Sequence, residues 1–187
     1  MLDRARVIDR WLNVEPLYLD DTAPRREYIA GQIAQYVAPG SSVLEIGCNA
    51  GSNLVALQRR GFCRLFGIDV SARAIEAARK RVDFAAFPGS LSEWFDHLKS
   101  AGPYDLVFSL AVLMHIHEDD DAVLHRIPEL VGKYLITCEW EHTGGEYIAA
   151  RDYGELFGGQ LKQIHHESVA SVENIDGYQL RVFEAAR

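Results

Sequence analysis

A strand, a glycine-containing loop and the start of a helix follow one another in residues 42–54, and this stretch restricts the possible folds most. Its apolar beginning favours a short strand, and Gly47 and Gly51 leave two loop positions without side chains. A side chain at either position would keep a ligand away from the backbone N–H groups. A second apolar run, Leu65–Ile68, ends in Asp69. An acidic residue there is typical of an α/β sheet that holds a ribose, so the sequence predicts a site for a nucleoside-containing cofactor.

Strand-like and helix-like segments alternate along the rest of the chain. Such alternation predicts an α/β, doubly wound, mostly parallel seven-stranded sheet in a single domain, with the ligand at the carboxyl ends of the strands. The expected strands are Val43–Ile46, Leu65–Asp69, Phe84–Phe87, Tyr104–Ser109 and Lys133–Cys138, followed by an antiparallel pair, Lys162–His166 and Tyr178–Glu184. The expected helices cover about 25–37, 52–60, 72–81, 91–100, 119–130 and 149–157.

Residues 1–40 show helical spacing of apolar side chains and no strand-like alternation. We interpret them as an N-terminal helical arm or lid that precedes an α/β core in residues 41–187. The chain of 187 residues is long enough for one domain with a substantial core and short for two. We therefore expect a single domain over residues 1–187.

Charge and composition exclude several classes of partner. A net charge of −8 argues against a nucleic-acid backbone as the main partner, because binding it requires a basic surface. There is neither a signal-like apolar run at the start nor a stretch as long as a membrane span, so we expect a cytoplasmic protein without a membrane partner. The three cysteines have no disulfide or zinc-site spacing. A homodimer remains open.

The order of residue types in this loop distinguishes between possible cofactors. The run is Glu45-x-Gly47-x-Asn49-x-Gly51, whereas the dinucleotide fingerprint is Gly-x-Gly-x-x-Gly. The run resembles motif I of the class I S-adenosylmethionine (SAM) methyltransferases, commonly E-x-G-x-G-x-G. Asn49 stands where that family usually has glycine. Because asparagine is the non-glycine residue that best tolerates a positive φ, the turn remains feasible.

Later segments resemble the same family in order and spacing, over residues 41 to about 140. They are Gly67–Ser71, Gly89–Leu91, Tyr104–Val107 and Val112–Ile116. The resemblance implies that SAM is the cofactor, that the acid after the second strand takes the ribose hydroxyls, and that the next apolar residue packs on adenine. The cofactor-binding residues implied are Glu45, Gly47, Cys48, Asn49, Gly51, Asp69, Val70, Ser90, Leu91, Leu110 and, from the arm, Arg26.

Histidine and glutamate side chains follow the fourth and fifth expected strands. An imidazole is suited to proton removal near neutral pH, so His115 is the leading candidate for a general base, and Glu139 and His142 are the next candidates. Tyr18 and His117 are predicted to contact substrate. A structural histidine that shapes the pocket floor is the alternative for His115. His115, His117, Glu139 and His142 are suitable metal ligands in type, but they have no recognised ligand spacing, so no metal is expected.

Methyl transfer to a small molecule is the leading functional hypothesis. The arm and the short segment after the fifth strand leave room for a compact acceptor with a hydroxyl, amine or carboxylate, such as a sugar derivative, metabolite or natural-product intermediate. The alternatives are a non-catalytic SAM-binding scaffold, an NAD-dependent oxidoreductase and a macromolecular acceptor. The absence of the Gly-x-Gly-x-x-Gly fingerprint argues against the oxidoreductase.

Overall fold

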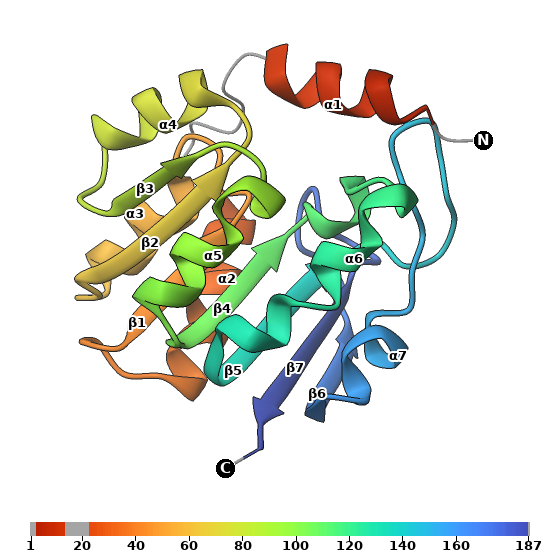
Figure 1. Cartoon of the computed structure of the whole chain (residues 1–187). Coiled ribbons are helices and arrows are strands. Elements are labelled where there is room, and N and C mark those ends of the chain that lie inside the picture. Colours follow the sequence, from red (N-terminus) through yellow and green to blue (C-terminus); the bar gives the residue numbers. More distant parts are fainter. Residues whose placement is uncertain (1–2, 14–22, 187) are drawn as a thin grey trace.

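A computed structural model describes residues 3–13 and 23–186 of the chain. The described strands form one seven-stranded sheet in the order β3-β2-β1-β4-β5-β7-β6 (Figure 1). Strands β1 to β5 are parallel, and β7 is antiparallel to both of its neighbours, β5 and β6. The predicted doubly wound α/β fold and its final antiparallel pair are therefore confirmed. The strands are β1 (Ser42–Ile46), β2 (Arg64–Asp69), β3 (Ala85–Pro88), β4 (Tyr104–Leu110), β5 (Val131–Glu139), β6 (Leu161–Ser168) and β7 (Gln179–Ala185).

The central strands are continuously apolar because both faces of the sheet are covered. In β1, Val43 packs into the core on one face and Leu44 into the core on the other. Leu106 and Val107 of β4 divide between the same two cores. This is the pattern expected of a buried parallel strand, in which consecutive side chains point to opposite faces.

Helices cover both faces of the sheet. On one face lie α2 (Pro24–Tyr36), α3 (Ser52–Arg59) and α4 (Ala72–Arg79). On the other lie α5 (Leu91–Ala101), α6 (Asp121–Leu124) and α7 (Tyr153–Gly158). Within the described residues, no helix is both long and apolar enough to span a membrane.

Two predicted helices are shorter than expected. The segment 119–130 was predicted as one helix, but it consists of η2 (Glu118–Asp120), α6 and η3 (Ile127–Leu130). Pro128 lies within η3, where its ring and missing N–H disfavour a continuous α-helix. The helix expected from Ala149 begins only at Tyr153, capped by the Asp152 side chain, which accepts a hydrogen bond from the N–H of Glu155.

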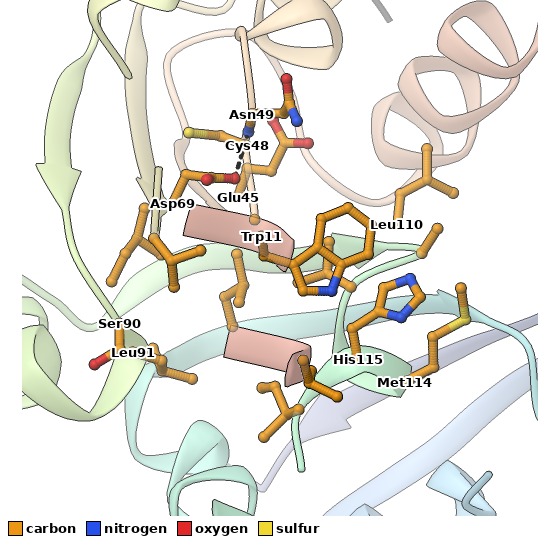
Figure 2. A pocket seen from close by; sticks show the side chains of 18 of the residues that line it. Trp11, Glu45, Cys48, Asn49, Asp69, Ser90, Leu91, Leu110, Met114 and His115 are labelled. Atoms are coloured by element: carbon orange, nitrogen blue, oxygen red, sulfur yellow. Dashed lines mark hydrogen bonds between the residues drawn. The ribbon is translucent and has the colours of Figure 1, made fainter. Parts of the chain in front are cut away.

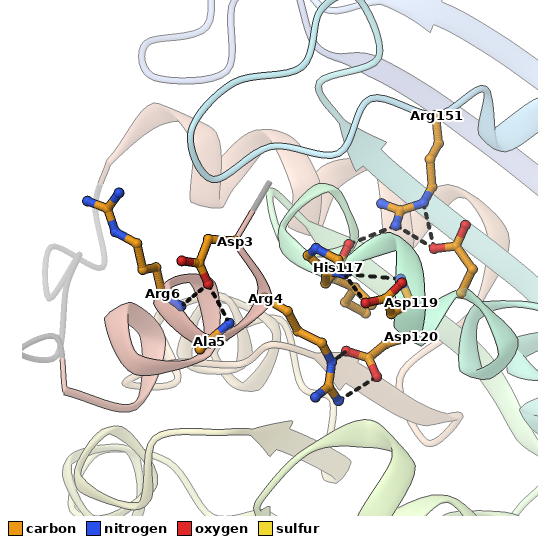
Figure 3. A network of polar contacts seen from close by, with 10 residues as sticks. Asp3, Arg4, Ala5, Arg6, His117, Asp119, Asp120 and Arg151 are labelled. Atoms are coloured by element: carbon orange, nitrogen blue, oxygen red, sulfur yellow. Dashed lines mark hydrogen bonds and ion pairs between the residues drawn. The ribbon is translucent and has the colours of Figure 1, made fainter. Parts of the chain in front are cut away.

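Helix α1 (Arg4–Asn13) crosses above the carboxyl ends of the parallel strands (Figure 1). It is fixed at its start by Arg4, which donates two hydrogen bonds to the Asp120 carboxylate at 2.9 and 2.8 Å (Figure 3). Val7 is its buried residue, whereas Ile8 and Leu12 remain 40% and 45% exposed. The helix therefore roofs the strand ends without being packed into either core.

Candidate functional site

A cavity of about 540 Å³ lies at the carboxyl ends of β1, β2 and β4. Strands β2 and β4 flank β1 on opposite sides, so the chain order reverses at this point. Ligands of open α/β sheets bind in the crevice at such a reversal. Helix α1 covers the cavity, and the start of α2 adds Arg25 and Arg26 to its lining. The cavity volume is in the range of sites for small ligands.

The loop between β1 and α3 forms the turn predicted from its glycines. Gly47, Asn49 and Gly51 have φ values of 75°, 44° and 76°, so asparagine does adopt the left-handed conformation here. The N–H of Gly47 donates to the carbonyl of Ile68 at 2.8 Å, which fastens the loop to β2. A Cβ on Gly47 would lie 2.3 Å from a methyl carbon of Val112. The glycine is therefore required both by the backbone conformation and by the close approach of the loop after β4.

Asp69 ends β2 and lines the cavity. Its two carboxylate oxygens accept hydrogen bonds from the N–H groups of Asn49 at 2.8 Å and Ser71 at 2.9 Å. Burial raises the pKa of this carboxyl, and the two N–H groups oppose that shift. Since each carboxylate oxygen has further acceptor capacity, the side chain can still accept hydrogen bonds from vicinal hydroxyls in the cavity.

A buried polar chain connects the arm to the loop. Arg26 donates to the Asn53 amide oxygen at 2.8 Å, and the Asn53 amide nitrogen donates to Oε1 of Glu45 at 2.6 Å. The remaining oxygen of Glu45, Oε2, is buried and has no hydrogen-bond partner within the described residues. Burial raises the pKa of Glu45 to about 8. All three residues line the cavity, so this end presents a cation and an acidic group with an unused oxygen.

Apolar side chains line the opposite wall of the same region. Val70 and Leu110 line the cavity, as do Ser90 and Leu91 at the start of α5. The Ser90 hydroxyl belongs to a capping box, in which it accepts from the N–H of Glu93 at 3.3 Å while the Glu93 carboxylate accepts from the N–H of Ser90 at 2.7 Å. Ser90 thus shapes this wall chiefly as a helix cap. Cys48 also lines the cavity and is buried, with burial raising the pKa of its thiol.

His115 lies in the turn after β4, at the other end of the cavity (Figure 2). Its Nδ1 lies 2.6 Å from the carbonyl oxygen of Tyr147, which can only accept, so Nδ1 carries the proton and Nε2 keeps a lone pair. The imidazole also packs on Trp11 of α1, with ring centroids 4.5 Å apart. Burial lowers the pKa of His115, and the positive charge of Arg10 lowers it further. The ring is therefore neutral near pH 7 and able to accept a proton.

Glu139 and His142 were predicted as catalytic residues, and the structure places both away from the cavity. Neither lines the cavity. Glu139 is fully buried at the end of β5, where its carboxylate accepts hydrogen bonds from the N–H groups of Val112 at 2.9 Å and Met114 at 3.4 Å. His142 is exposed and its Nε2 lies 2.9 Å from the carbonyl oxygen of Gly177. Glu139 thus holds the turn that carries His115, and His142 belongs to a different surface.

Arg151 also supports this turn, although no sequence pattern indicated that role. Its guanidinium donates to the carbonyl oxygens of Leu113 at 3.3 Å and Ile116 at 2.7 Å, and it pairs with Asp121 (Figure 3). Ala111, which precedes the turn, has a φ of 59°, an uncommon conformation for a residue with a side chain. A buried carboxylate and a buried guanidinium therefore fix the turn at its N–H and C=O groups respectively.

Two predicted substrate contacts remain, His117 and Tyr18, together with one residue that was not predicted. His117 lines the cavity near its rim, and its Nδ1 accepts a hydrogen bond from the N–H of Asp119 at 3.1 Å. Tyr18 lies outside the described residues. Trp11 lines the cavity but was not predicted as a site residue, because its spacing on α1 was interpreted only as helical packing. In the described part of the chain, no three His, Cys, Asp or Glu side chains are grouped as a metal site would need.

The chain is similar to known protein families and solved structures over long segments, not only at single residues. Residues 44–133 match the family described as "Methyltransferase domain". Over 104 residues, the chain is 32% identical to the ribosomal protein L11 methyltransferase of Thermotoga maritima, an alignment that covers 53% of this chain and 39% of that protein. The chain thus spans about two-fifths of the length of this curated relative.

Two solved structures share the whole fold. Magnesium protoporphyrin IX methyltransferase from Synechocystis, with bound SAM, has a TM-score of 0.68 at 17% identity, with coverage of 100% of this chain and 98% of that one. The N-methyltransferase NodS from Bradyrhizobium japonicum, with S-adenosylhomocysteine, has a TM-score of 0.70 at 19% identity, covering 99% and 100%. Residues 44–133 thus match a methyltransferase domain, and the chain shares the fold of these solved methyltransferases. At sequence identities of 17% and 19%, these structures are evidence for the fold alone.

The cavity has two chemically different ends. At one end, Asp69 and the hydrogen-bonded chain of Arg26, Asn53 and Glu45 offer polar groups, and Val70, Leu91 and Leu110 are apolar lining residues. At the other end, the imidazole of His115 and the indole of Trp11 are surrounded by side chains that are mainly apolar, namely Val7, Ile8, Met114, Ile116 and Val123. Because a single cavity joins the two ends, a group bound at one end can reach a group bound at the other.

Proposed function

We propose that this chain is an S-adenosylmethionine-dependent methyltransferase that acts on a small-molecule acceptor. The observation that carries the proposal is the joining, in one cavity, of a nucleoside-type site at Asp69 to a neutral imidazole at His115. Family membership of residues 44–133 and the fold shared with methyltransferases support the same activity.

The cofactor end fits the parts of SAM residue by residue. The Asp69 carboxylate would accept the ribose hydroxyls, and the apolar wall with Val70 and Leu91 would enclose the adenine. Arg26 would pair with the carboxylate of the methionine part. The buried Oε2 of Glu45 has no partner within the described residues, and it would accept a hydrogen bond from the ammonium group of the methionine part.

The residues of this chain would contribute position, exclusion of water and proton removal. Bound SAM supplies an electrophilic methyl group, whose transfer to a nucleophile is governed by alignment. Glu139 and Arg151 hold the turn with His115, and α1 covers the cavity against solvent. His115 would take the proton that the acceptor loses, through Nε2.

A small acceptor is favoured over a macromolecule by the roof of the cavity. Helix α1 contributes Val7, Ile8, Trp11 and Leu12 to the walls, and Arg4 fastens it to the rim at Asp120. A protein side chain would have to enter beneath this helix. A protein acceptor is nevertheless the second candidate, because the Thermotoga maritima relative is a ribosomal protein methyltransferase.

Calorimetry and labelling test the proposal. We expect S-adenosylhomocysteine and SAM to bind and NAD not to bind, and NAD binding without either sulfur compound would refute the cofactor assignment. A cell lysate supplied with methyl-labelled SAM should then show label in its small-molecule fraction. Label confined to macromolecules would refute the acceptor class, and binding without turnover across a metabolite library would favour a non-catalytic scaffold.

A further inference from the structure

Two polar groups at the acceptor end have no hydrogen-bond partner in the described part of the chain. The indole N–H of Trp11 is buried, lines the cavity and donates to no group. Nε2 of His115 is the nitrogen not engaged by the Tyr147 carbonyl. A buried N–H that has lost water and found no protein acceptor is destabilising, so its presence in a cavity wall indicates a ligand atom that accepts from it.

The two groups have opposite hydrogen-bonding roles. An indole N–H can only donate. Because the Tyr147 carbonyl requires a proton on Nδ1, Nε2 of His115 can only accept while the ring is neutral. The indole and imidazole are packed against each other, with centroids 4.5 Å apart and planes tilted by 43° (Figure 2). One donor and one acceptor therefore belong to two rings that contact each other.

We propose that the acceptor atom is a hydroxyl oxygen on a compact apolar molecule, held by the N–H of Trp11 and Nε2 of His115. This inference rests on the proposed function and goes further, since it selects among hydroxyl, amine and carboxylate acceptors. A hydroxyl is the group that both accepts from one neighbour and donates to the other. An ammonium has no lone pair for Trp11, an aromatic amine is a weak acceptor, and a carboxylate has no proton to give to His115.

The side chains that line the acceptor end favour an apolar molecule as the one that bears this hydroxyl. Val7, Ile8, Met114 and Ile116 line the same end of the cavity. Arg4 pairs with Asp120, and Arg10 lies over the Tyr147 ring, 4.4 Å from its centroid. The positive charge of Arg10, which acts on His115, disfavours a cationic acceptor at this end.

The reaction step follows from this placement. The hydroxyl oxygen forms a bond to the methyl carbon of the sulfonium donor, while the carbon–sulfur bond breaks and leaves its electron pair on sulfur. The hydroxyl proton passes to Nε2 of His115, which becomes a positively charged imidazolium. The Trp11 N–H stabilises the negative charge that develops on oxygen as the proton leaves.

A matched pair of probes tests the inference without requiring turnover. The probes are 4-ethylphenol and 4-ethylaniline, both neutral at pH 7.5 and differing only in the polar group, added to protein saturated with S-adenosylhomocysteine. We expect the phenol to bind at least about tenfold more tightly, because only the phenol satisfies both groups. The indole N–H resonance of Trp11, assigned by its loss in Trp11→Phe, should shift downfield with the phenol and not with the aniline.

Three variants decide which groups cause the preference. Trp11→Phe and His115→Phe keep an aromatic ring but remove one hydrogen-bonding group each, so each should abolish the preference for the phenol. Trp140→Phe is the control, since the Trp140 N–H donates to the Thr143 carbonyl at 3.2 Å and Trp140 does not line the cavity. Equal affinity for the two probes, binding of neither, or a preference that survives Trp11→Phe would overturn the inference. Failure of S-adenosylhomocysteine to bind would instead refute the proposed function.

Discussion

The end of the cavity around Asp69 is assembled mainly from nearby segments, residues 45–53 and 67–71, whereas the end around His115 combines residues 4–13, 110–117 and 147–151. The first end is shaped largely by backbone, through positive φ values at Gly47 and Gly51 and N–H donors that orient Asp69. The second is shaped by side chains that come from distant segments and fix one turn. In the proposed function, cofactor binding and choice of acceptor are thus carried by structurally separate parts.

This difference predicts separable effects of mutation. Changes around Asp69 should alter affinity for S-adenosylhomocysteine, while changes around His115 should alter turnover at constant affinity. Four predictions, in order of decreasing effect, test whether the two ends are in fact independent.

Replacement of His115 by asparagine should have the largest effect. If Nε2 takes the acceptor proton, kcat should fall by about 10²–10⁴-fold, while the Kd of S-adenosylhomocysteine stays unchanged. The parent rate should rise with pH through one ionisation below the ordinary histidine pKa of 6.5, because burial lowers the pKa of His115. That step should be absent from the variant. A large loss of cofactor affinity in a folded His115→Asn protein would show that the two ends are coupled.

Replacement of Glu139 by glutamine tests the support beneath the acceptor end. Burial raises the pKa of Glu139 from 4.5 to about 7, so its ionisation opposes folding. The stabilising contribution of the neutral carboxyl is complete below pH 4.5 and is lost as the pH rises through 7. The free energy of unfolding of the parent, relative to Glu139→Gln, should therefore fall by up to about 3 kcal/mol over this window.

Denaturant titrations between pH 4 and 8 measure this difference. Glu93→Gln is a matched control of opposite sign, because hydrogen bonds from Ser90 lower the pKa of Glu93. Its contribution is present above the ordinary carboxyl pKa and is lost as the pH falls. A parent and a Glu139→Gln variant with parallel pH profiles would contradict the burial of a carboxylate beneath the turn.

Replacement of Asp69 by alanine tests the cofactor end. Loss of hydrogen bonds to the ribose hydroxyls, worth about 1.5–3 kcal/mol each, should weaken S-adenosylhomocysteine binding by at least about tenfold. Asp83→Ala, which changes an exposed aspartate, should leave binding unchanged. Calorimetry gives both values, and circular dichroism checks the fold. Unaltered affinity in a folded Asp69→Ala protein would remove the carboxylate from the cofactor site.

The two ends also differ in how far the sequence could predict them. The loop glycines, Asn49 and Asp69 are recognisable because backbone geometry demands particular residue types at fixed spacing. The topology followed from the alternation of apolar segments, although Pro128 broke a helix that acidic residues had suggested. At the acceptor end, His115 was identifiable by its chemistry. Trp11 and Arg151 were not identifiable, because their roles depend on contacts with residues that are distant in the sequence. Trp11 contacts His115, and Arg151 contacts Ile116.

The smallest predicted effect concerns the ion pair that attaches helix α1 above the cavity. Arg4 and Asp120 form an ion pair with two hydrogen bonds, but the Arg4 side chain is 50% exposed. Exposed pairs contribute little and are screened by salt. Arg4→Met should therefore raise the acceptor KM by only about two- to fivefold at low ionic strength, with unchanged kcat and cofactor affinity. The difference from the parent should shrink as salt is added.

Lys133→Met is the matched control, since Lys133 pairs with Asp105 at 2.9 Å with similar exposure, at the opposite end of the sheet. It removes an ion pair of the same kind without touching α1, so the acceptor KM should remain at the parent value at every salt concentration. Equal effects of the two variants would mean that general electrostatics, rather than the attachment of α1, governs acceptor binding. A fall in kcat with Arg4→Met would mean that α1 also orients Trp11 during the reaction, and the acceptor end would then extend to the first residues of the helix.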